Sequence, residues 1–247
     1  MTGLRWTMLG ERRAISLLLL AFYTSIFALL AIAQGGAWMA CFGALAATYG
    51  IAFFALASEW FWARWFAMGL GISGVTMAAL GLVSVGWNWG LAIWGAMHGA
   101  IYLPLLGRAM ADRYENQQAW RQRYNLDEHA VARIKRAVHG TATALPTMIL
   151  YTLAPRQDQA LFGLLLLVGL GAYGLLRMRV WGVLLLGGAA VWGGISALGG
   201  AALATACGAC SGGLLLPVWG LFGAAALLVA VSPFILPAIR FVRQPPR

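Results

Sequence analysis

The sequence is short of charged residues, and above all of acidic residues, lysine and cysteine. Only 10% of its 247 residues are charged, with seven acidic against 17 basic residues and Lys135 as the single lysine. A soluble domain is about 25% charged and about 45–50% apolar, whereas this chain is 62% hydrophobic. Three cysteines are too few for a disulfide framework. These shortages exclude a soluble globular domain, a disordered chain and a disulfide-framed secreted module, and they leave a membrane protein.

Long apolar runs predict transmembrane helices. A helix needs about 20 mainly apolar residues to cross about 30 Å of hydrocarbon, and no segment has the alternating pattern of a membrane-barrel strand. The apolar run at the N-terminus is longer than a signal-peptide core of about 7–15 residues, so we expect it to be retained. We predict an all-α polytopic bundle of about eight transmembrane helices, forming a single domain over residues 1–247. The predicted spans are residues 14–34, 37–57, 65–85, 87–106, 137–153, 160–176, 180–198 and 214–235.

The positions of the basic residues predict the orientation. If the N-terminus is cytoplasmic, every Lys and Arg except Arg156 falls on the cytoplasmic side of these eight spans. Cytoplasmic loops of membrane proteins collect Lys and Arg. We therefore expect a multi-pass inner-membrane protein with both termini cytoplasmic. The net charge of +10 is then an orientation signal, and no nucleic-acid partner is expected.

Two connections are longer than the rest. Residues 108–136 form a cytoplasmic loop, in which residues 109–124 fit an amphipathic helix against an anionic leaflet or, alternatively, a solvated helical hairpin. Asn125 followed by Glu128 fits a capping box, which predicts a helix running on into the fifth span. Residues 199–213 form an outer loop. The membrane-surface candidates are Arg113, Tyr114, Trp120, Arg121, Arg123 and Tyr124.

His98 is the most informative polar residue within the predicted spans. All seven acidic residues fall in loops or at span edges, which disfavours a proton-coupled pump or transporter. His98 lies in the middle of the fourth span, and Gly95 and Gly99 beside it form a pair that permits close helix approach. It is either a structural histidine hydrogen-bonded between helices or part of a ligand site. The predicted ligand-lining residues are Trp87, Asn88, Trp89, Trp94 and His98.

Ser73 in the third span lies at about the same depth as His98, and a serine beside a base is an arrangement for nucleophilic catalysis. Gly71-Ile72-Ser73-Gly74 resembles the GxSG motif of rhomboid intramembrane proteases, which implies a catalytic serine and histidine. The segment from Trp94 to Gly99 is similar to a WGxxHG segment of membrane-bound O-acyltransferases, which implies acyl transfer at His98. Each resemblance covers under ten residues, and the other motifs of both families are missing from the chain.

Cys207 and Cys210 form a CxxC pair in the predicted outer loop. They could form a structural disulfide, stay free, act as a redox pair or contact a metal, although two thiolates alone are an incomplete metal site, so no metal is predicted. A haem held by His98 and His139 is disfavoured, because the two residues differ in depth by about 10 Å. No cofactor is assigned.

Three classes of function follow. The favoured class is a non-enzymatic subunit, carrier or binding protein for a lipid-like, pigment or other uncharged ligand, or for a membrane partner. Its 12 Trp and 32 Gly suit tight helix interfaces and flat ligand contacts. The alternatives are an intramembrane acyl-transfer or hydrolytic enzyme using His98 with Ser73, and an outer-face thiol–disulfide protein using Cys207 and Cys210. The expected partners are membrane lipid and a membrane protein or a second copy of the chain.

Overall fold

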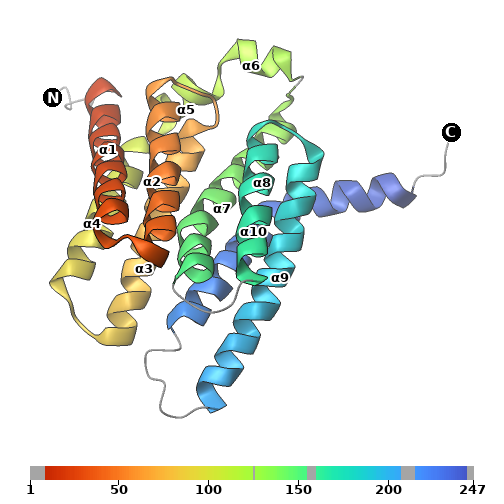
Figure 1. The fold of residues 1–247 in the computed structure, drawn as a ribbon. Coiled ribbons are helices and arrows are strands. Elements are labelled where there is room, and N and C mark those ends of the chain that lie inside the picture. The colour runs from red at the N-terminus through yellow and green to blue at the C-terminus, as the bar shows by residue number, and fades with distance from the viewer. Residues whose placement is uncertain (1–8, 125, 155–159, 207–214, 244–247) are drawn as a thin grey trace.

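Helices make up all the regular secondary structure of the described residues. A computed structural model describes residues 9–124, 126–154, 160–206 and 215–243. Its elements, drawn in Figure 1, are α1 (Leu9–Gln34), α2 (Gly36–Ala57), α3 (Ala63–Val85), α4 (Trp89–Tyr102), η1 (Leu103–Leu105), α5 (Arg108–Glu115), α6 (Gln118–Arg123), α7 (Glu128–Leu153), α8 (Ala160–Leu176), α9 (Val180–Ala206) and α10 (Leu215–Arg243). The all-α polytopic bundle is confirmed.

Each of the eight predicted spans overlaps a helix, but the helices differ in how well they fit a membrane. Five are long and apolar enough to cross one, namely α1, α2, α3, α9 and α10. A sixth candidate combines α4 and η1 with α5, which is bent away by 73°. Helix α8 is apolar but shorter, and α7 does not reach the same hydropathy. The crossing of all eight helices stays a prediction.

Helix α7 occupies the centre of the bundle. It packs against α3 on one side and against α10 on the other, and α8 and α2 also contact it. In Figure 1 the α1–α4 group lies to its left and α8 and α9 to its right, whereas α10 crosses behind it. A helix surrounded by protein needs no lipid-facing apolar side chains, so α7 tolerates its many threonines. Thr143, for example, donates from Oγ1 to the carbonyl oxygens of His139 (2.9 Å) and Gly69 (3.2 Å), the second on α3.

Glycines allow α7 to approach both neighbours. A Cβ on Gly69 of α3 would lie 2.5 Å from the carbonyl oxygen of His139. A Cβ on Gly140 of α7 would lie 3.0 Å from the carbonyl oxygen of Ala226 on α10. Backbone contact of this kind is how helices gain packing energy in a membrane, where the surrounding lipid is as apolar as the side chains.

The predicted helix over residues 109–124 is broken in two. Helix α5 ends at Glu115 and α6 begins at Gln118. Tyr114 was expected at the membrane surface, and that expectation is wrong. Its ring is fully buried, and its hydroxyl donates to the carbonyl oxygen of Leu56 at 3.1 Å. Tyr114 therefore attaches α5 to the end of α2.

Helix α7 begins at Glu128, as the capping pattern predicted to within a few residues, but the cap is Asp127. Its carboxylate accepts from the backbone N–H of Ala130 at 2.5 Å. Asn125 lies outside the described residues. From this cap the helix continues without interruption to Leu153, so the prediction of one continuous helix from the loop through residues 137–153 is confirmed.

Helices α5 and α6 and the turn between α8 and α9 lie at the end of the bundle where α1 begins (Figure 1), which we call the basic end. The five ion pairs of the described residues all lie there, between Arg13 and Lys135 in the sequence. Glu59 pairs with Arg13 and Arg113, and Glu115 with Arg64 and Lys135. The Glu59 pairs join α1 and α5 to the turn after α2, and the Glu115 pairs join α3 and α7 to α5.

Candidate functional site

His98 lies buried where four helices meet. It projects from α4, and its side chain is completely shielded from solvent. Its Nδ1 lies 2.9 Å from the carbonyl oxygen of Trp94, one turn earlier, and its Nε2 lies 2.7 Å from the hydroxyl of Tyr49 on α2. A carbonyl oxygen only accepts, so Nδ1 carries the proton, and in the neutral ring Nε2 accepts from the Tyr49 hydroxyl. Both ring nitrogens therefore have partners.

Aromatic rings enclose the imidazole. The ring centroid of Tyr23 on α1 lies 4.3 Å from that of His98, and the centroid of Trp94 lies 4.5 Å away. Tyr23 also contacts Tyr49 at 5.3 Å and Trp94 at 5.0 Å. Phe27 closes one side, 5.4 Å from Tyr49. We call Tyr23, Phe27, Tyr49, Trp94 and His98 the aromatic site.

The hydroxyl of Tyr23 is the unusual group of this site. The Tyr23 side chain is only 2% exposed, and among the described residues its oxygen has no hydrogen-bond partner. A buried polar group left without a partner costs about 1–3 kcal/mol, and most such groups are satisfied by protein or by an ordered molecule. The Tyr23 hydroxyl beside His98 is therefore a buried hydrogen-bond donor without an acceptor among the described residues.

The glycines of Gly71-Ile72-Ser73-Gly74 seat His98 against α3. A Cβ on Gly74 would lie 2.0 Å from Cγ and Cδ2 of the imidazole, and one on Gly71 would lie 3.0 Å from the His98 carbonyl oxygen. The prediction of close approach at Gly95 and Gly99 is met at Gly95, where a Cβ would lie 2.9 Å from the Cβ of Ala78 on α3. At Gly99 a Cβ would make an ordinary contact, 3.9 Å from Cγ2 of Val75. The motif thus has a packing role that its resemblance to a protease motif did not suggest.

Ser73 lies on the helix that packs against α4, but no hydrogen bond joins it to His98 in the described structure. Its side chain is fully buried, and its hydroxyl contacts Sδ of Met77 at 4.0 Å. With Nδ1 and Nε2 of His98 already bonded to Trp94 and Tyr49, neither nitrogen is free to accept a proton from a serine. The geometry gives no support to a catalytic Ser73–His98 pair.

The predicted ligand-lining residues separate into two groups. Trp94 joins His98 in the aromatic site. Trp87 and Trp89 are both 70% exposed and contact each other edge to face at 5.4 Å. Asn88 caps α4 by accepting from the N–H of Leu91 at 3.2 Å. Ten residues of helix separate Asn88 from His98, about 15 Å, so these three residues form the end of α4 and do not line the same site.

The remaining candidates lie at the basic end or outside the described residues. Arg113 pairs with Glu59, and Arg121 pairs with Glu128. Trp120 stacks on Tyr124, and the guanidinium of Arg123 lies over both rings. Cys207 and Cys210 fall outside the described residues. Within the part of the chain that the structure describes, no group of three His, Cys, Asp or Glu residues could hold a metal.

Besides Phe27, the residues of the aromatic site that sequence analysis missed are Tyr23 and Tyr49. Each is a tyrosine within a long apolar helix, α1 or α2, and a hydroxyl buried in a membrane span needs a partner. A tyrosine within each apolar run could therefore have been predicted to contact a polar group on another helix, but the sequence does not identify that helix. Only the packing of α1 and α2 against α4 shows that both tyrosines contact His98.

The comparisons with known proteins identify no relative of this chain. No family model matches the sequence, and neither a curated protein nor a solved structure matches the chain. Its class is therefore defined by its own architecture, that of an integral membrane protein built as an all-α helix bundle.

Proposed function

We propose that the protein is a non-enzymatic, membrane-embedded binding protein for an uncharged, lipid-like ligand, held at the aromatic site. The observation that carries the proposal is the buried Tyr23 hydroxyl without a partner beside the His98 imidazole. It is a donor available to a carbonyl or ether oxygen. Rings from α1, α2 and α4 offer flat apolar contacts to the rest of such a ligand.

The chemistry of the site favours binding over catalysis. Its polar groups are hydroxyls and a neutral imidazole whose two nitrogens are occupied. A general base needs a free acceptor within hydrogen-bond reach of the proton that it removes. Neutral polar groups surrounded by aromatic rings suit the recognition of a neutral ligand, because binding it leaves no buried charge unpaired.

The test is the variant Tyr23→Phe, with Tyr102→Phe on α4 as the matched control. The probe is a decyl-substituted benzoquinone, a neutral amphiphile with carbonyl acceptors, measured by native mass spectrometry of the full chain. Loss of the Tyr23 hydroxyl should weaken probe binding about fivefold to tenfold, as expected for one hydrogen bond of about 1–1.5 kcal/mol. Tyr102→Phe should bind like the wild type.

The same variant separates a ligand site from a packing defect. Without ligand, Tyr23→Phe removes an unsatisfied hydroxyl and should raise the thermal stability of the protein. Higher stability together with weaker binding supports the proposal. Higher stability with unchanged probe binding would show that the hydroxyl is an unpaired buried group with no part in ligand binding. The proposed function would then be wrong.

A further inference from the structure

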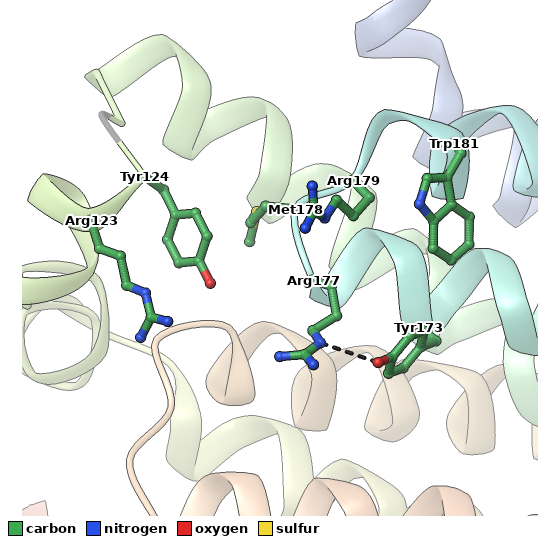
Figure 2. A pocket seen from close by; sticks show the side chains of 7 residues that line it. All are labelled: Arg123, Tyr124, Tyr173, Arg177, Met178, Arg179 and Trp181. Carbon is green, nitrogen blue, oxygen red and sulfur yellow. Dashed lines mark hydrogen bonds between the residues drawn. The ribbon is translucent and has the colours of Figure 1, made fainter.

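A second site lies at the basic end, far along the chain from the aromatic site. An open cavity of about 650 Å³ lies between the end of α6 and the turn that joins α8 to α9. Its lining includes Arg123 and Tyr124 from the α6 end and Arg177 and Arg179 from the turn. Figure 2 shows these side chains around a common space, and we call it the arginine cavity.

The arginine cavity concentrates positive charge without compensation. Among the residues that the structure describes, Arg123, Arg177 and Arg179 line it together with no carboxylate, and none of the five ion pairs includes them. By contrast, Arg121, two residues before Arg123, pairs with Glu128 at 3.0 Å. Three like charges around one space repel one another and create a strong field for an anion.

Aromatic side chains hold two of the guanidinium groups in position. Arg177 donates from Nε to the hydroxyl of Tyr173 at 3.2 Å (Figure 2), which leaves its terminal nitrogens available. The Arg123 guanidinium lies 5.7 Å from the ring centre of Tyr124 and 5.8 Å from that of Trp120. A guanidinium that is already oriented loses less conformational entropy when it binds a ligand.

The turn between α8 and α9 places an arginine on each side of Met178, namely Arg177 and Arg179. Met178 has a φ of 56°, a left-handed conformation that costs a residue with a Cβ about 1–2 kcal/mol. The N–H of Arg179 donates to the carbonyl oxygen of Gly174 at 2.8 Å, and that of Met178 to Leu175 at 2.9 Å. Two consecutive bonds of this kind are the usual helix end, where glycine is the common residue. Strain of this sort clusters at ligand-holding sites.

An apolar path leads from the cavity along the outside of the bundle. Leu166, Leu170 and Tyr173 are spaced along one face of α8 and are all more than half exposed. Tyr173 lines the cavity at the end of this face. A ligand with an anionic head in the cavity can thus extend an acyl chain along α8 into the hydrocarbon.

From this arrangement we propose that the arginine cavity binds the phosphate group of an anionic phospholipid. Arginine forks match phosphate oxygens and bind them through two parallel hydrogen bonds, and the cavity is large enough for a headgroup rather than a bare ion. Basic pockets between membrane helices at the cytoplasmic side are suited to such headgroups. The site is independent of the aromatic site, because none of its residues is shared.

The experiment uses the full chain in non-ionic detergent and measures binding of dioctanoyl phosphatidylglycerol by native mass spectrometry. Arg177→Gln should weaken binding about tenfold, the loss expected for one charge-assisted hydrogen-bonding contact. Arg177→Lys should recover only part of the affinity, since lysine keeps the charge but not the fork. Arg108→Gln is the matched control, because Arg108 is an exposed arginine of the basic end outside the cavity.

Three outcomes would overturn the proposal. One is unchanged lipid binding in Arg177→Gln. The second is an equal loss in Arg108→Gln, which would show that surface charge in general attracts the lipid. The third is inorganic phosphate binding as tightly as the phosphatidylglycerol, which would make a free anion the ligand. Binding lost only in the cavity variants, with dioctanoyl phosphatidylcholine and inorganic phosphate both weaker, supports it. Thermal unfolding of each variant shows whether it is folded.

Discussion

The turns after α2 and after α8 have the same backbone conformation, but they differ in whether charged partners surround them. Each ends a helix with a left-handed residue that is not glycine, Glu59 (φ 55°) or Met178 (φ 56°), and each has the same two backbone hydrogen bonds. The Glu59 carboxylate pairs with two arginines from other helices. Met178 lies between two arginines for which the described residues provide no carboxylate. The first turn is held to other helices by ion pairs, whereas the arginines of the second turn have no ion-pair partner among the described residues.

This difference extends to the regions around the two turns. We call Arg13, Glu59, Arg64, Arg113 and Glu115 the paired cluster, in which each charged group contacts an opposite charge. The charged groups that line the arginine cavity are, among the described residues, all positive. A group paired within the protein contributes to stability, whereas one without an internal partner is free to bind an external ion. Substitutions in the paired cluster should therefore change stability, and those in the cavity should change binding.

The largest expected effect comes from Glu115. Its carboxylate accepts from Arg64, from Nε1 of Trp65 at 2.8 Å and from Lys135 at 3.3 Å. The Arg64 side chain is only 5% exposed, so Glu115→Ala leaves a buried charge uncompensated. The free energy of unfolding should fall by about 3–5 kcal/mol. Denaturation in detergent measures it.

Two control variants sharpen this first prediction. Glu128→Gln should cost less than about 0.5 kcal/mol, because Glu128 pairs with Arg121 from a side chain that is 85% exposed. Arg179→Gln in the arginine cavity should leave unfolding unchanged. A loss for Arg179→Gln as large as for Glu115→Ala would contradict the contrast between the two regions.

The second effect compares two helical glycines, one in each half of the chain. A Cβ on Gly74 would overlap the His98 ring, whereas one on Gly188 of α9 would meet nothing within 4 Å. The ring cannot easily give way, because Trp94 and Tyr49 hold both of its nitrogens. Gly74→Ala should cost at least about 1–3 kcal/mol, and Gly188→Ala should be neutral or slightly stabilising. Thermal unfolding of the two variants checks this, and similar melting temperatures would refute it.

The third effect is a pH dependence of the paired cluster. Hydrogen bonds from Arg113, and with them the charges of Arg13 and Arg113, lower the pKa of Glu59 below its ordinary value of 4.5. A carboxyl with a lowered folded-state pKa contributes stability that is complete above pH 4.5 and is lost as the pH falls through the lowered value. We expect the wild type to lose more stability on acidification than Glu59→Gln. Melting temperatures between pH 7 and pH 3 measure the difference, and parallel curves would contradict it.

The sequence predicted the fold better than the sites, for a physical reason. Apolar runs and basic residues respond to the membrane, which acts on each helix separately, so the helices and the buried His98 could be predicted. Contacts between helices depend on packing. The sequence alone did not show that Tyr23 and Tyr49 meet at His98, or that Arg123 and Arg177 share a cavity. The position of Tyr114 was predicted wrongly for the same reason. Its sequence pattern fitted a surface helix, and only the packing of α5 against the end of α2 buries its ring.

The smallest expected effect tests the two turns directly. Glycine at position 178 removes the strain of the left-handed conformation, about 1–2 kcal/mol, but increases the entropy of the unfolded chain by about 0.4–1 kcal/mol. Met178→Gly should therefore stabilise the protein by a few tenths of a kcal/mol to about 1 kcal/mol. Glu59→Gly gains the same relief but loses the contacts with Arg13 and Arg113, each worth about 0.2–1 kcal/mol, so it should not stabilise. Equal gains for both variants in thermal unfolding would mean that the Glu59 ion pairs contribute nothing to the fold.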